Sequence, residues 1–299
     1  MSAAAGRIRE LCHRFHLPTV GAEAEPRFVA AGQAQALPTL AEVLELEAED
    51  RRQRRITRLR YASKLPPGKT AASFEATRLP PKLQHQLGEL AGGGFLEHST
   101  NLLAFGLPGT GKTHAVCALG HRLLEAGHAV HFTPAYRLVQ ELLAAKRDLA
   151  LPRALRKLDQ FEVLILDDLG YLQQDTAEAD VLFTLLAERY ERRSLVITSN
   201  LVFSQWDQIF RNPMATAAAI DRIVHHSVIL EFDVPSYRTE AAKRRTGTSA
   251  PETQPSAASR PMSRPAGPAG TKSPDFVGLD QRSENKTSLK AGEIKKGKK

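Results

Sequence analysis

Eight consecutive residues, Gly106 to Thr113, have a spacing that could hold phosphate groups. They read Gly-Leu-Pro-Gly-Thr-Gly-Lys-Thr and satisfy the pattern G-x-x-x-x-G-K-[ST]. Glycines in such a loop let backbone N–H groups wrap around phosphates at the positive end of the following helix. We expect Lys112 to reach the β- and γ-phosphates and the Thr113 hydroxyl to ligate magnesium. The segment therefore predicts a site for ATP and Mg2+, with contacts from Gly106, Leu107, Pro108, Gly109, Thr110, Gly111, Lys112, Thr113 and His114.

A second pattern is an apolar run that leads into two carboxylates. Residues 163–168 read Val-Leu-Ile-Leu-Asp-Asp. Asp167 is expected to hold the magnesium ion, directly or through water, and Asp168 to orient and polarise the attacking water. Two surface acids that cap the next helix are the alternative, but four apolar residues beside a phosphate loop favour the metal site. The second acid predicts ATP hydrolysis, because small-molecule kinases usually lack a water-activating acid at this point.

Further polar residues follow these two motifs. Asn200 closes the apolar stretch SLVITSN and is expected to help place the water, although Asn also closes strands by turn chemistry. Arg222, supplied by a neighbouring subunit, could stabilise charge on the transferring phosphoryl group, and Arg238, within its own chain, could report the nucleotide state. Local salt bridges explain both arginines equally well. We interpret His225 and His226 as a helix end, because no spaced acid or cysteine accompanies them.

The surrounding segments predict the elements that position these residues. Apolar runs of strand length, such as residues 101–106 and 163–168, alternate with helical stretches such as residues 112–125 and 177–192. Strands that are apolar at consecutive positions are buried on both faces, as in a parallel sheet covered by helices. We therefore predict a three-layer α/β P-loop fold, with the strand before Asn200 between the strands of the two motifs.

Charge divides the chain into three parts. Residues 1–95 hold 14 basic and 10 acidic side chains, residues 96–245 hold 17 and 18, and residues 246–299 hold 10 and 5. A neutral core with basic flanks is typical of an enzyme whose arms approach a polyanion, most simply nucleic acid. We predict a helical, basic N-terminal region with a connector, then a P-loop ATPase domain, then a disordered basic tail.

The two flanks differ in character. Six arginines lie among residues 51–60, in a segment that predicts a helix. This helix has either a solvated face or a surface for phosphates or an acidic partner, and the arginine density favours the surface. Residues 63–81 contain four prolines and predict an extended connector. The tail is rich in Ser, Thr, Pro, Gly and Lys, so it cannot offset the entropy of ordering.

The cysteine content and the hydropathy pattern indicate the compartment. Cys12 and Cys117 are the only cysteines and lie in regions of different character, so no disulfide framework is expected. The chain has neither an apolar signal core at its N-terminus nor a run of about 18 apolar residues. The expectation is a cytoplasmic protein without a membrane segment.

Together these motifs resemble a known family. The likeness rests on GLPGTGKTHAVCALG, LILDDLGYL, ITSNLVFSQW and AIDRIVHHSVILEFDVPSYR, and extends over about residues 35–245. The chain resembles the IstB type of ATP-binding protein, the transposition helper of IS21-like insertion sequences, which is similar to DnaC helicase loaders. The resemblance implies an AAA+ ATPase that forms homo-oligomers on largely non-specific duplex DNA with ATP, helps select or remodel a target site, and stimulates the transposase encoded by the same element.

The resemblance also implies individual roles. Asn200 corresponds to sensor 1, Arg222 to an arginine finger and Arg238 to sensor 2. Many AAA+ proteins carry Glu where this chain has Asp168, and the shorter side chain implies slow hydrolysis suited to a switch. A separate helical lid is expected to be absent or minimal, because the chain ends soon after Arg238 apart from the tail.

Three alternatives remain open at this point. A helicase loader has the same core and differs in its protein partner. A P-loop kinase for a small substrate would yield a phosphorylated acceptor instead of free phosphate. A DNA scaffold that binds ATP without hydrolysing it is compatible with Asp168.

Overall fold

The computed structural model describes residues 2–171, 176–206, 209 and 213–240. The chain divides into two compact units, Met1–Ser249 and Ala250–Lys299, and all described residues belong to the first unit. The predicted disordered tail, residues 246–299, therefore lies outside the described residues. Any lid-forming segment after residue 240 lies outside them as well.

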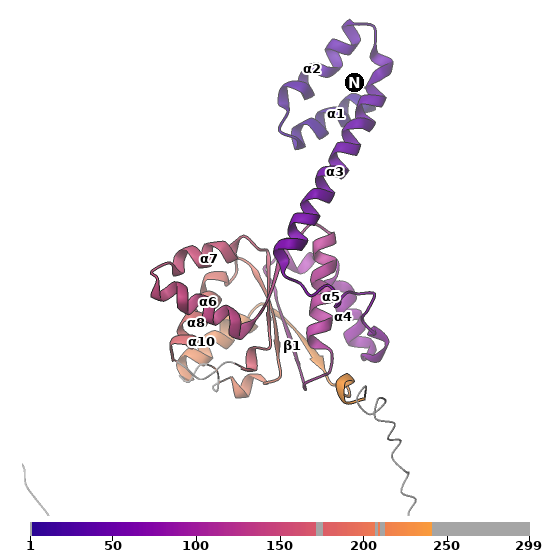
Figure 1. Ribbon diagram of the computed structural model, residues 1–299. Helices are drawn as coiled ribbons and strands as arrows, with labels where there is room; N and C mark the ends of the chain where they lie inside the picture. Colours follow the sequence, from indigo (N-terminus) through magenta and orange to yellow (C-terminus); the bar gives the residue numbers. More distant parts are fainter. Residues whose placement is uncertain (1, 172–175, 207–208, 210–212, 241–299) are drawn as a thin grey trace, which may run out of the picture. The chain divides into compact units, whose positions relative to one another are not determined.

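Five parallel strands form the central sheet (Figure 1). They are β1 (Asn101–Gly106), β2 (Val130–Pro134), β3 (Val163–Asp167), β4 (Ser194–Ser199) and β5 (Ser227–Phe232). Their order is β2-β3-β4-β1-β5, and every neighbouring pair is parallel. Strands β3 and β4 are buried at every position, as expected for a sheet covered on both faces. Strand β4 lies between β1 and β3, which confirms the predicted position of the strand before Asn200.

Helices cover both faces of the sheet (Figure 1). One face packs against α6 (Ala135–Arg147), α7 (Leu151–Asp159), α8 (Thr176–Arg189) and α10 (Pro213–Val224). The other face packs against α4 (Pro81–Leu90) and α5 (Lys112–Glu125). Each face has its own apolar cluster, so burial on both sides stabilises the sheet. This arrangement confirms the predicted three-layer α/β class.

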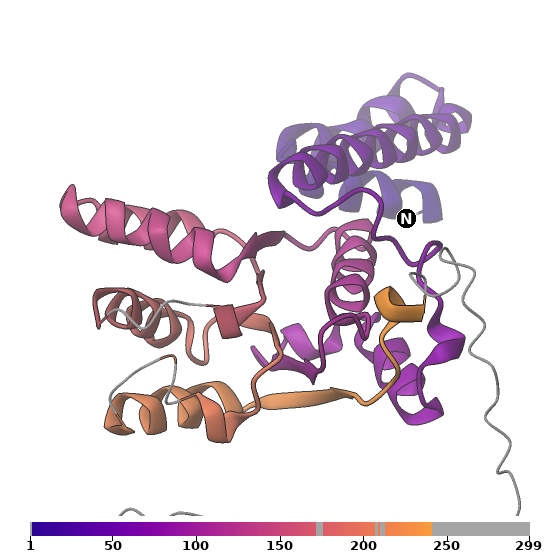
Figure 2. The same ribbon diagram turned by 60° about the horizontal axis from the view of Figure 1, so that its bottom comes forward.

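The N-terminal helices are α1 (Ala3–Arg14), α2 (Pro18–Ala30) and α3 (Leu37–Ser63). They lie side by side (Figure 2) and bury two small apolar clusters around Ile8 and Leu11. The end of α3 packs against the sheet, where Leu59 joins the cluster beneath α5. Short 3-10 turns occupy Ala34–Ala36, Ala76–Arg78, Gly94–Leu96, Leu169–Tyr171 and Phe203–Gln205.

Two further observations bear on the expectations from sequence. Cys12 and Cys117 are buried free thiols, as expected. Within the part of the chain that the structure describes, no helix combines the length and the apolar character needed to cross a bilayer.

Candidate functional site

The loop between β1 and α5 requires glycine at two positions. Gly109 and Gly111 have φ angles of 84° and 97°, in the left-handed region that side chains with a Cβ rarely adopt. A Cβ on Gly109 would lie 2.2 Å from the Ser236 Oγ, so a side chain there would also collide with its neighbour. Gly111 is the N-cap residue of α5. The loop therefore ends at the positive end of a helix, where an anion is stabilised.

Lys112 holds the beginning of the loop. Its Nζ donates hydrogen bonds to the carbonyl oxygens of Gly106, at 2.7 Å, and Leu107, at 2.9 Å. An ammonium group has three donors, so one N–H remains for a further acceptor. Burial lowers the pKa of Lys112, whereas Asp168 and Asp167 oppose that shift. The two carboxylates thus favour the charged form of the lysine.

The two acids are tied to their surroundings by two threonines. Asp167 Oδ1 accepts hydrogen bonds from Thr113 Oγ1, at 2.8 Å, and from Thr198 Oγ1, at 2.7 Å. The Thr198 hydroxyl also accepts a bond from the backbone N–H of Asp168, at 2.9 Å. Asp168 has a φ of 58°, an uncommon conformation for a residue other than glycine. Thr198 therefore fixes the side chain of one acid and the backbone of the next.

The electrostatic surroundings of Asp168 favour a basic carboxylate. Burial raises the pKa of Asp168, and the charge of Asp167 raises it further. Lys112, Arg238 and Lys69 oppose this shift by stabilising the ionised form. A carboxylate with a raised pKa accepts a proton more readily than an ordinary aspartate does.

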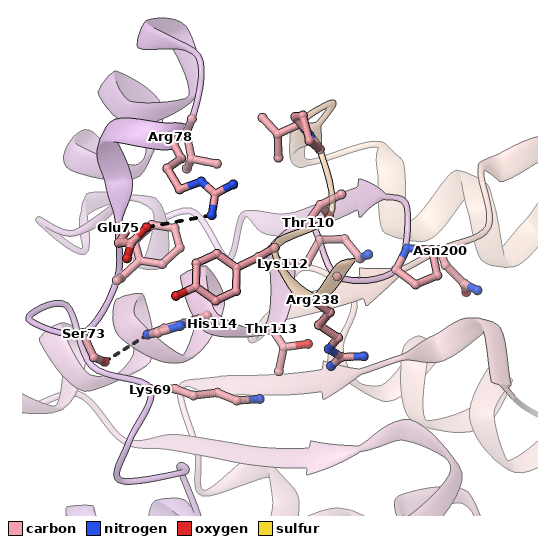
Figure 3. Close-up of a pocket in the computed structure, with 18 of the residues that line it drawn as sticks. Lys69, Ser73, Glu75, Arg78, Thr110, Lys112, Thr113, His114, Asn200 and Arg238 are labelled. Carbon is pink, nitrogen blue, oxygen red and sulfur yellow. Dashed lines mark hydrogen bonds and ion pairs between the residues drawn. The ribbon is translucent and has the colours of Figure 1, made fainter. Parts of the chain in front are cut away.

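These groups surround a cavity of ≈ 330 Å³ (Figure 3). Its wall includes the loop from Pro108 to His114, together with Asp168, Asn200 and Arg238. The opposite wall comes from the connector before α4 and from the turn after β5, with Lys69, Ser73, Phe74, Glu75, Arg78 and Tyr237. The volume falls within the range of small-molecule sites, and many of the lining side chains are polar or charged.

The connector and the C-terminal turn are bonded to the phosphate loop. Ser73 Oγ and His114 Nε2 are 3.0 Å apart, and the Phe74 and His114 rings lie 5.2 Å apart between centroids. The backbone N–H of Tyr237 donates to the Gly109 carbonyl at 2.9 Å. Two segments far from the loop in sequence thus complete the cavity.

The structure brings most of the predicted site residues together. Lys112, Thr113, Asp168, Asn200 and Arg238 line the cavity, and Asp167 is bonded to Thr113. Gly106 and Leu107 lie at the start of the loop and contribute carbonyl groups to Lys112. The side chain of His114 contacts the connector.

Asn200 packs tightly against Gly170. A Cβ on Gly170 would lie only 2.2 Å from the Asn200 Oδ1. This oxygen is buried and has no hydrogen-bond partner among the described residues. The Asn200 Oδ1 therefore faces Gly170, although the residue itself lines the cavity.

Arg222 lies away from this cavity. It is in α10, near the amino end of β5, whereas the phosphate loop follows the carboxyl end of the adjacent parallel strand β1. Its guanidinium carbon lies 4.8 Å from the centroid of the Phe183 ring, and its Nη1 is buried without a hydrogen-bond partner among the described residues. Arg222 therefore cannot reach the phosphate loop of its own chain.

His225 and His226 directly follow the end of α10 at Val224, which confirms the predicted helix end, but an acid does accompany them. Glu191 supplies the acid that the sequence did not reveal near His225 and His226. Its Oε1 lies 3.5 Å from the His226 Nε2. All three residues are exposed. The contact joins the end of α8 to the end of α10, so local spacing could not show it.

The sequence also left several residues of the cavity unassigned. Thr198 lies two residues before Asn200, and its strand position directly beside the Asp167 strand is a signal that could have identified it. Lys69, Ser73 and Phe74 lie in the proline-containing connector and carry no motif of their own. Their approach to the loop depends on tertiary packing.

Comparisons with known proteins show the family to which the chain belongs. The family model described as IstB-like ATP binding protein matches residues 19–245. An insertion sequence ATP-binding protein of Sinorhizobium fredii is 39% identical over 287 residues, which cover 95% of this chain and 92% of the relative. An insertion sequence IS21 ATP-binding protein of Pseudomonas aeruginosa is 39% identical over 216 residues, which cover 72% of this chain and 81% of the relative.

A solved structure shares the fold. The replication initiator DnaA, bound to AMPPCP and single-stranded DNA, matches with a TM-score of 0.50 and 16% identity. The match covers 62% of this chain and 56% of that chain. At this identity the likeness concerns the fold alone.

Proposed function

Because the chain belongs to the family of IstB-like ATP-binding proteins, we propose that it hydrolyses ATP with Mg2+ and uses the nucleotide state to assemble on DNA and stimulate a partner transposase. The observation that carries the proposal is that Lys112, Thr113 and Asp168 line one cavity, with Asp167 hydrogen-bonded to Thr113. The relatives are insertion sequence ATP-binding proteins, which supports a role beside a transposase.

The residues present fit a magnesium nucleotide. Gly109 and Gly111 provide a loop that phosphates can approach closely, and Lys112 retains a free N–H. Thr113 and Asp167 offer two adjacent oxygen ligands, the type that Mg2+ prefers. When bound there, the ion would neutralise charge on the phosphate oxygens.

Asp168 and Asn200 are proposed to handle the attacking water. Asp168 accepts a proton from the water, for which its raised pKa is suited. Asn200 lines the same cavity, and its side-chain amide is proposed to orient the same water. Arg238 faces Asp168 and Lys112 closely enough to affect the pKa of both, so its charge is available to the phosphates. These roles together make hydrolysis, with release of free phosphate, the reaction that the site supports best.

Arg222 is proposed to act on the site of a neighbouring protomer. It lies near the amino end of β5, whereas the phosphate loop of its own chain follows the carboxyl end of β1. Its buried and unpaired Nη1 indicates a cation whose hydrogen bonds are not satisfied within the described chain. An arginine offered in trans stabilises charge on the transferring phosphoryl group. Hydrolysis would then require assembly, which links the nucleotide state to the oligomer.

Mixing two inactive variants tests the shared site. Lys112→Ala should abolish ATP binding measured by calorimetry, whereas Arg222→Ala should retain binding but lose phosphate release. In a mixture, Arg222 of the first variant can complete the intact loop of the second, so part of the activity should return. Arg192→Ala, which removes an exposed arginine paired with Asp159, is the matched control and should hydrolyse normally. Undiminished ATP affinity in Lys112→Ala would overturn the site assignment.

Dependence on assembly and DNA gives a second readout. Phosphate release by the wild type should rise with protein concentration and with added duplex DNA, and Arg222→Ala should respond to neither. Equal rates in the two proteins, with no response to DNA, would reject the shared site. A phosphorylated small-molecule acceptor in place of free phosphate would identify a kinase instead.

A further inference from the structure

The arginines of α3 fall into two groups that differ in their partners. Those of the first group are bonded to acids of the preceding turn, in the pairs Arg51–Glu47, Arg52–Glu49 and Arg54–Asp50. Arg55, Arg58 and Arg60 are exposed and have no ion-pair partner among the described residues. The uncompensated positive charge of α3 therefore lies in its last three turns.

The same part of α3 exposes an aromatic ring. Ile56, Leu59 and Ser63 face the interior and are buried or partly buried. Tyr61 is 92% exposed, although aromatic side chains are normally packed. An exposed ring among unpaired arginines is expected where a helix meets nucleic acid, because it can pack against sugars or bases.

A second set of unpaired cations lies on α7. Arg153, Arg156 and Lys157 are exposed, and within the described ranges they form no ion pair. Their spacing places them on one side of the helix, while Leu155 and Leu158 pack against the apolar cluster on the other. The positive face of α7 is therefore turned to solvent.

Lys64, directly after α3, and Lys157 of α7 both lie near His131 of β2. His131 Nδ1 lies 3.1 Å from the Ala62 carbonyl near the end of α3, and its ring stacks on Phe161, which follows α7. Burial lowers the pKa of His131, and the charges of Lys64 and Lys157 lower it further. Both lysines are thus close to one imidazole. Glu141 is the acid that acts on this histidine, and it is paired with Arg137.

These residues define the basic surface, which comprises Arg55, Arg58, Lys64, Arg153, Arg156 and Lys157, with Tyr61 beside it. It lies near the amino ends of β2 and β3, because His131 and Phe161 are at or before the starts of these strands. The phosphate loop follows the carboxyl end of β1, and all strands are parallel. The basic surface is therefore separate from the nucleotide cavity.

We propose that the basic surface binds the phosphate backbone of duplex DNA without sequence preference. The proposal rests on the proposed function and names the part of the chain that contacts DNA. From Arg55 to Lys64 the helix extends about 14 Å, a length over which a duplex presents several phosphate charges. A protein-binding surface would require an apolar centre, whereas these side chains supply charge and one ring.

Salt dependence of binding tests the proposal on the full chain with Mg-ATP. Anisotropy of a labelled duplex gives the affinity at a series of salt concentrations. The slope of log affinity against log salt is negative, and each lost phosphate contact should reduce its magnitude by about 0.9. In the double variant Arg55→Ala/Arg58→Ala, the magnitude of the slope should therefore fall by about 1.8. This variant should also bind the duplex at least about tenfold more weakly at low salt. Arg153→Ala/Arg156→Ala should behave in the same way.

The matched control is Arg51→Ala/Arg54→Ala. It removes two arginines from the same helix and changes the net charge equally, but these arginines already have acidic partners. Its slope should stay close to that of the wild type. A control that loses as much slope as the Arg55→Ala/Arg58→Ala variant would show that only net charge matters and would overturn the assignment.

The outcomes also separate this surface from the proposed function. A wild type that binds no duplex at low salt would remove the DNA role itself. Normal wild-type binding with unchanged slopes in both test variants would reject the basic surface and leave that role standing. Stronger binding of the basic surface to an acidic polypeptide than to duplex would reject it as well. Unchanged basal ATPase activity in each variant shows that the fold is retained.

Discussion

Thr198→Val is expected to separate the chemistry of the site from ATP binding. Valine has nearly the shape of threonine but lacks the hydroxyl, which donates to Asp167 and accepts from the Asp168 N–H. The side chain is 0% exposed, so water cannot replace these two bonds. The substitution frees the Asp167 carboxylate on one side and leaves the backbone that holds Asp168 unsupported.

The size of the effect follows from the two lost bonds. A hydrogen bond to a charged group contributes roughly 1.5–3 kcal/mol and a neutral one roughly 0.5–1.5 kcal/mol, partly offset by burial of the new methyl group. We expect the free energy of unfolding to fall by about 2–3 kcal/mol and Tm by roughly 4–10 °C. Because Asp168 has a φ of 58°, its carboxylate should also shift once this support is lost. The expected loss in kcat is about ten- to hundredfold, or roughly 1.4–2.7 kcal/mol in the barrier.

Steady-state phosphate release and calorimetry measure the two effects separately. The ATP affinity should change little, because the loop and Lys112 keep their bonds. Thr198→Ser retains the hydroxyl and should recover most of the kcat. Thr133→Val is the matched control, since Thr133 is buried near the carboxyl end of β2 but bonds only to the Pro134 carbonyl in the structure. A Thr198→Val protein with wild-type kcat, or one whose kcat falls no more than that of Thr133→Val, would refute the positioning role of Thr198.

Two other substitutions act on the same site. Gly170→Ala places a Cβ 2.2 Å from the Asn200 Oδ1, so Asn200 must move. Phosphate release should then fall about tenfold or more, while the ATP affinity stays unchanged. An unchanged rate of phosphate release would remove Asn200 from the mechanism. Arg238→Ala removes a cation that lowers the pKa of Asp168, so this pKa should rise and the acid limb of the pH–rate profile should move to higher pH. An acid limb that stays in place or moves to lower pH would show that Asp168 is not the titrating base.

Local patterns were enough to predict the sheet and its central motifs. Apolar runs gave the β1 and β3 strands because a buried parallel strand is apolar on both faces. The carboxyl ends of parallel strands meet at one edge, so Asp167 and Asn200 could be placed beside the loop. The helix α7 was not predicted, although Leu151, Leu155 and Leu158 follow its apolar face at helical spacing.

Contacts between segments that are far apart in the sequence could not be predicted from these patterns. The sequence predicted an extended connector, but nothing in its composition shows that Ser73 and Phe74 reach His114. The same holds for Glu191 beside His226, which depends on how α8 and α10 pack. Such contacts depend on the fold as a whole. In the sequence, a turn residue that makes such a contact cannot be distinguished from one that does not.

The connector gives the nucleotide cavity a direct physical link to the basic surface. It begins at Lys64, directly after α3, and forms one wall of the cavity with Lys69 and Phe74. The turn after β5 belongs to the same wall: its Tyr237 N–H donates to the Gly109 carbonyl, and its Glu240 pairs with Arg78 of the connector. A movement of the phosphate loop would therefore disturb the contacts of the connector, which leads back to the end of α3. If the basic surface contacts DNA as proposed, about ten residues of chain join it to the nucleotide cavity.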